Sequence, residues 1–99
     1  RVVVFTFRRI LTPGSNMLVS PYQVLRAIIK DSRGNQAPTE TELWADALLV
    51  MGHQRWRAEQ MPIYHDPRRY VLGQLAPLTG EQSPVYRFIA TRSAEKVSA

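Results

Sequence analysis

The first residues of the chain carry its clearest β-type pattern. Branched and aromatic side chains dominate residues 2–10, and these residue types favour strands. A turn composition follows at residues 12–16, and residues 17–19 are a candidate second strand that folds back as a hairpin. Because an unpaired strand leaves backbone groups without partners, we expect residues 2–10 to pair with residues 17–19, with the C-terminal segment or with another chain.

The segment after this candidate hairpin has the spacing of an amphipathic helix. Ser20 can cap it, Pro21 suits its first turn, and Gln23 completes a capping box. Apolar residues then recur at helical spacing, and Gly34 supplies a C-terminal stop. The pattern predicts a helix from Pro21 to Arg33.

A second capping box predicts the next helix. Thr39 and Glu42 have the required spacing, and the helix is expected over residues 40–54, fraying through Glu59. Gly52 weakens its later part, because glycine is a poor helix former. We expect the core-facing stripe to consist of the apolar residues at helical spacing. These are Leu43, Ala47, Val50 and Met51, with Trp44 and Leu48 widening the stripe.

Two further helices are predicted where a capping residue precedes proline. Asp66-Pro67 opens a short helix that ends near Pro77. Ser83-Pro84 opens another, although residues 84–92 also alternate as a strand would; the cap favours the helix. Residues 93–99 are expected to fray. The whole pattern predicts one small α+β domain over residues 1–99, with an N-terminal strand or hairpin followed by three to four helices.

Composition narrows the chemistry that this domain can perform. The 99-residue chain has no cysteine, which excludes disulfides, thiolate metal sites and a cysteine nucleophile. It has no apolar run of about 18 residues, so no transmembrane segment is predicted. No targeting segment is visible, and together with the lack of cysteine this favours an intracellular location.

Charge points to binding partners rather than to a reaction. The net charge is +5, and all the basic residues except Lys30 and Lys96 are arginines. Guanidinium groups bind phosphate and carboxylate through a planar fork and stack on aromatic rings. A basic chain of this kind suits acidic protein faces or polyanions such as RNA.

One cluster combines these arginines with aromatic rings. It flanks the loop at residues 58–67 and is predicted to form one accessible binding surface. Its members are Arg55, Trp56, Arg57, Arg68, Arg69 and Tyr70. From this cluster we predict a non-catalytic binding or structural subunit of a larger protein or ribonucleoprotein assembly. Other protein chains are the favoured partners, RNA or another polyanion is the alternative, and no metal or cofactor is expected.

Two other classes of function remain open. A small enzyme could use His53 or His65 as an acid–base group with Asp66 or Glu59, provided that a histidine lies within hydrogen-bond reach of a carboxylate. A DNA-binding module would need an exposed helix with base-reading residues, and no predicted helix has a fully basic face.

Overall fold

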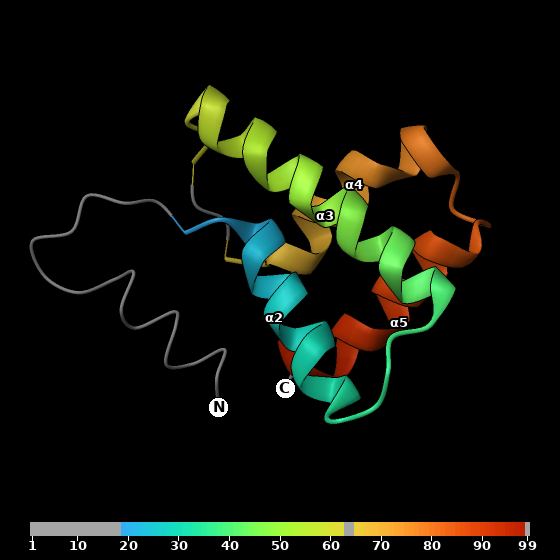
Figure 1. Ribbon diagram of the computed structural model, residues 1–99. Coiled ribbons are helices and arrows are strands. Elements are labelled where there is room, and N and C mark those ends of the chain that lie inside the picture. Colours follow the sequence, from blue (N-terminus) through green and yellow to red (C-terminus); the bar gives the residue numbers. More distant parts are fainter. Residues whose placement is uncertain (1–18, 63–64, 99) are drawn as a thin grey trace, which may run out of the picture.

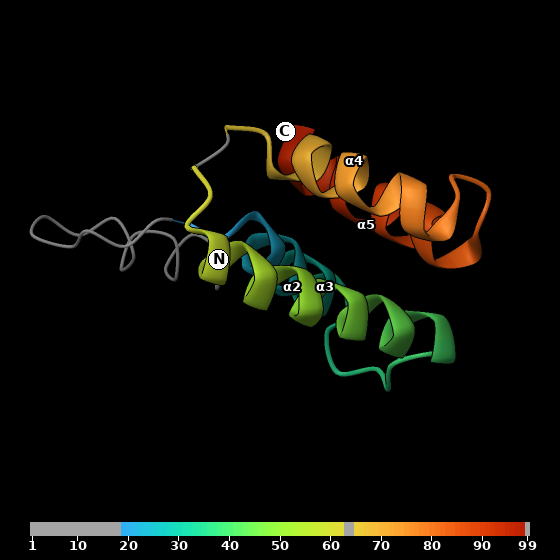
Figure 2. The same cartoon turned by 90° about the horizontal axis from the view of Figure 1, so that it is seen from above.

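A computed structural model describes residues 19–62 and 65–98 of the chain. These residues form four α-helices, namely α2 (Pro21–Arg33), α3 (Glu40–Glu59), α4 (Pro67–Thr79) and α5 (Pro84–Ser98). The helices form two layers, with the α2–α3 pair packed on the α4–α5 pair (Figures 1 and 2). Helices α2 and α5 each contact the other three helices, so these two join the layers.

Each helix begins at a side chain that accepts a hydrogen bond from the first turn. The acceptors and their donors are Ser20 Oγ with Gln23 N–H (3.4 Å), Thr39 Oγ1 with Glu42 N–H (3.1 Å), Asp66 Oδ1 with Arg69 N–H (3.2 Å) and Ser83 Oγ with Tyr86 N–H (3.1 Å). These caps satisfy backbone donors that have no partner within the helix. The four predicted helix starts are confirmed, and α2 has the predicted bounds.

The predicted α+β class is wrong. The described residues contain four helices and no strand, and residues 84–92 belong to helix α5. The expected strand over residues 2–10 and the residues Met17 and Leu18 lie outside the described part of the chain. Val19 is described; it is buried and lies directly before the helix cap Ser20 rather than in a strand. The prediction treated local β propensity as evidence for a sheet, although strand formation depends on cross-strand packing that the residues of one segment do not reveal.

Three helices extend further than the sequence pattern predicts. Helix α3 continues to Glu59 because the buried Trp56 anchors its last turns, and Gln60 ends it in the left-handed conformation with φ 52°. Helix α4 runs two residues beyond Pro77 and stops at Gly80, with φ 82°. Helix α5 reaches Ser98, through the segment expected to fray, and the Ser93 side chain within that segment is fully buried.

The buried face of α3 is not the predicted one. Its buried residues are Glu42, Ala45, Leu49 and Trp56. Within the predicted stripe, Leu43, Trp44 and Met51 are instead 57%, 61% and 63% exposed. Ala47 is also exposed, and Val50 and Leu48 are only half-buried. Leu43, Trp44, Ala47 and Met51 therefore face away from the core, whereas Leu48 packs against it.

Small residues explain which face of α3 packs. An added Cβ at Gly52 would overlap ring atoms of Tyr22, a buried residue of α2, so the two helices touch where glycine has no side chain. Ala45 lies two turns earlier on the same face and is fully buried. Close helix approach at these two positions lets Leu49 and Trp56 enter the core, with Leu25 and Ile89 among its buried members.

Candidate interaction surface

Both aromatic residues of the predicted arginine–aromatic cluster serve the packing of the fold. Trp56 is only 4% exposed and belongs to the core. Tyr70 is half-buried; its hydroxyl lies 2.6 Å from Met61 Sδ, and its ring meets that of Tyr22 edge-to-face with centroids 6.0 Å apart. Neither ring is therefore presented as an open stacking platform for a base.

The four arginines of the cluster divide into two kinds. Arg55 pairs with Glu59 at 3.3 Å within α3, and Arg68 Nε donates to the carbonyl oxygen of Ala90, which ties α4 to α5. Arg57 and Arg69 are exposed and form no ion pair with a described residue. Among the four arginines of the cluster, the guanidinium groups of these two form no hydrogen bond or ion pair with a described residue.

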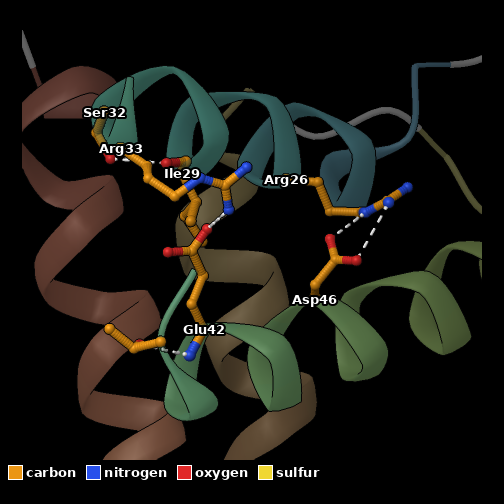
Figure 3. Close-up of polar contacts among 7 residues, drawn as sticks. Arg26, Ile29, Ser32, Arg33, Glu42 and Asp46 are labelled. Carbon is orange, nitrogen blue, oxygen red and sulfur yellow. Dashed lines mark hydrogen bonds and ion pairs between the residues drawn. The ribbon is translucent and has the colours of Figure 1, made fainter. Parts of the chain in front are cut away.

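Two ion pairs that the sequence did not reveal join α2 to α3. Arg26 binds both carboxylate oxygens of Asp46 (2.8 and 3.4 Å), and Arg33 pairs with the buried Glu42 (Figure 3). The Arg26 guanidinium holds the pKa of the Asp46 carboxyl below its usual range. A groove of about 230 Å³ lies along this seam, and its walls include both pairs. These contacts hold α3 against α2. The spacing of residues in the sequence does not predict them, because they form only when the two helices pack with a particular alignment.

The exposed side of α3 is the most distinctive surface of the described structure. We call it the α3 outer face, and it comprises Glu40, Leu43, Trp44, Ala47, Met51 and Arg55. Its apolar centre points away from the core, with an acidic residue at one end and a basic residue at the other. Tryptophan and methionine are enriched at protein interfaces, and contiguous exposed apolar patches commonly mark interaction sites. The hydrophobic pattern of the sequence predicts core positions for the apolar residues of this face, and they are exposed instead.

The two histidines occupy different environments. His53 is half-buried, and its Nδ1 atom has no hydrogen-bond partner among the described residues, whereas His65 is exposed. Burial lowers the pKa of His53 below its usual 6.5, and the positive charges of Arg57 and Arg26 lower it further. Among the described residues, no hydrogen bond joins either histidine to a carboxylate. The contact required by the acid–base alternative is therefore not formed in this part of the chain.

The His53 environment predicts a pH-dependent stability. As the pH falls below 6.5, the unfolded chain takes up a proton at residue 53 before the folded chain does, so the free energy of unfolding should decrease. Urea unfolding between pH 7.5 and 5.5 measures this loss. The His53→Gln variant should lose most of it, and the matched His65→Gln variant should keep it; equal pH profiles for wild type and His53→Gln would contradict the assignment.

Comparison with protein-family models, with curated proteins and with solved structures finds no match for this chain. Within residues 19–62 and 65–98, no helix is both long and apolar enough to cross a membrane. In the same residues, no three potential metal ligands of the His, Asp or Glu type lie together. The candidate site is therefore defined by the geometry of this four-helix unit alone.

Proposed function

We propose that this chain is a non-catalytic binding subunit of a larger assembly and that it contacts a protein partner through the α3 outer face. The supporting observation is that Leu43, Trp44 and Met51 are 57–63% exposed on one side of a helix whose opposite side is in the core. Exposure of such apolar side chains to water is unfavourable, and an interface that buries them lowers the free energy through the hydrophobic effect.

The chemistry of the face suits a protein surface. Leu43, Trp44 and Met51 supply an apolar centre, and the charged residues Glu40 and Arg55 lie at its two ends. An apolar centre with a polar rim is the usual anatomy of a protein interface. Trp44 is a suitable hot-spot residue, because a large aromatic side chain gains most from exclusion of water.

The exposed arginines support a second candidate surface. Arg57 and Arg69 lack ion pairs with described residues, and the chain has a net charge of +5. These features favour an acidic partner, either a protein or an RNA, that binds at the last turn of α3, which carries Arg57, at the first turn of α4, which carries Arg69, or at both. Trp56 is in the core and the Tyr70 hydroxyl contacts Met61, so this second candidate surface is argued from the two arginines alone.

Site-specific photo-crosslinking in cells that produce the chain tests both surfaces. A benzophenone amino acid is placed at Met51 on the α3 outer face, at Arg69 on the arginine surface, or at Gln74, an exposed position on α4, as the matched control. We expect a discrete adduct from the Met51 probe and none from the Gln74 probe. The mass of that adduct identifies the partner.

The other outcomes discriminate between the candidates. An adduct from the Arg69 probe alone would overturn the α3 outer face as the contact and favour the arginine surface. Equal labelling from the Met51 and Gln74 probes, or no adduct from any probe, would overturn the binding role that we assign to either surface.

A further inference from the structure

We infer that the partner of the α3 outer face is the same face of a second copy of this chain, with the two α3 helices antiparallel. This inference rests on the proposed function, since it names the partner for the surface assigned above. It follows from the order of residues along the face, from their charges and from the small residue at its centre.

The face is self-complementary when reversed. Its acidic end, Glu40, and its basic end, Arg55, are equally distant from a midpoint between Ala47 and Leu48. A two-fold axis through that midpoint therefore places Glu40 of each copy beside Arg55 of the other. It also brings Trp44 of each copy opposite Met51 of the other, so that apolar groups meet on both sides of the axis. This symmetry is the requirement for an isologous dimer.

The charges select the antiparallel direction. In a parallel pairing the two Glu40 carboxylates would be adjacent, and so would the two Arg55 guanidinium groups, which is unfavourable. The antiparallel pairing converts both contacts into ion pairs. Glu40 forms no ion pair with a described residue, and the Arg55 side chain remains 76% exposed beside Glu59, so both groups are accessible for such a contact. The two pairs also offset part of the repulsion between chains of net charge +5.

Ala47 permits the close approach that the pairing needs. It is exposed at the centre of the face, and its methyl group lets two helix axes come within about 8–10 Å while the larger residues on either side interdigitate. A contact made by one helix from each copy is small, so the dimer should be weak, with a dissociation constant on the order of 10–100 μM.

Sedimentation equilibrium of the purified 99-residue chain tests the dimer. Wild type should pass from 11.3 kDa toward twice that mass as its concentration rises through the micromolar range. Glu40→Arg and Arg55→Glu, each studied alone, place like charges at both ends of the pairing and should weaken association about tenfold or more. An equimolar mixture of the two variants should associate again, because each swapped charge then meets an opposite one.

Controls separate association from folding and from overall charge. Glu81→Arg changes an exposed charge away from α3 by the same amount and should leave association unchanged. Circular dichroism should show that each variant is as helical as wild type. Trp44→Ala, which removes an exposed ring and leaves the charges intact, should also weaken the dimer without unfolding the monomer.

Two results would overturn the inference. One is a mass of 11.3 kDa at all concentrations up to about 1 mM, well above the expected dissociation constant. The other is a dimer that is indifferent to both charge variants or is not restored by their mixture. A monomeric chain whose Met51 probe still captures a different protein would remove the dimer but leave the proposed function standing.

Discussion

Replacing Gly52 by alanine is expected to lower the free energy of unfolding by about 3 kcal/mol, although alanine is the better helix former. The added Cβ would overlap two atoms of the Tyr22 ring and lie 2.6 Å from its Cζ atom. The ring cannot move aside easily, because it is 5% exposed and held edge-on by Tyr70. Helices α2 and α3 would have to separate where the Tyr22 ring packs against Gly52. Chemical denaturation followed by circular dichroism measures the loss.

Gly73 provides the matched control for this substitution. It also lies within a helix, but an added Cβ there meets nothing within 4 Å. Gly73→Ala should therefore raise the stability by roughly 0.5–1 kcal/mol, which is the propensity gain alone. If Gly52 is limited by the Tyr22 ring, Gly52→Ala should cost less in a Tyr22→Leu background than in wild type. A neutral or stabilising Gly52→Ala would contradict the close approach of the two helices.

The helix starts were predictable because their determinants are local. A capping side chain, a proline in the first turn and a return hydrogen bond all lie within a few residues of each other. Helix α2 accordingly has the predicted bounds, and the cap at Ser83 correctly favoured a helix over residues 84–92. Helix ends were less predictable. The continuation of α3 beyond Gln54 depends on Trp56 entering a core that α2 and α5 complete.

The six residues of the predicted binding cluster do not share one exposed face, because adjacent helical residues point in different directions. Successive side chains diverge by about 100° around a helix. Since Trp56 points into the core, its neighbours Arg55 and Arg57 must project to either side of it. Adjacency in the sequence therefore groups residues that the helix separates. Conversely, helix packing brings together residues that are distant in the sequence. Arg26 and Asp46 are twenty residues apart and form an ion pair only after α2 and α3 pack.

The orientation of α3 could not be obtained from hydrophobicity alone. Both sides of this helix carry large apolar residues: Leu49 and Trp56 are buried, whereas Leu43, Trp44 and Met51 are exposed. The core side is instead distinguished by Ala45 and Gly52, whose small size allows the backbone of α3 to approach α2. Small residues at a helix–helix contact indicate close packing of the two helices. Large apolar residues that remain exposed on the opposite side indicate a candidate interaction surface.

Alanine substitutions at two leucines of α3 should therefore differ sharply in their effects. Leu49 is fully buried, and Leu49→Ala is expected to lower the free energy of unfolding by about 3–4 kcal/mol, because it removes apolar contacts and leaves a cavity. Leu43 is 57% exposed, and Leu43→Ala should change the stability of the monomer by less than about 0.5 kcal/mol. The two variants make the same chemical change on the same helix, so the difference isolates burial. Urea denaturation at low protein concentration measures it without a contribution from association.

The sequence pattern alone predicts the opposite order, since it assigns Leu43 to the core. Equal losses at the two positions, or a larger loss at Leu43, would mean that α3 is rotated from the orientation described and would remove the α3 outer face as a surface. With the expected order, Leu43→Ala should weaken any association made through that face while leaving the fold intact. One substitution would then separate the residues that hold the helix in place from those that the helix presents to a partner.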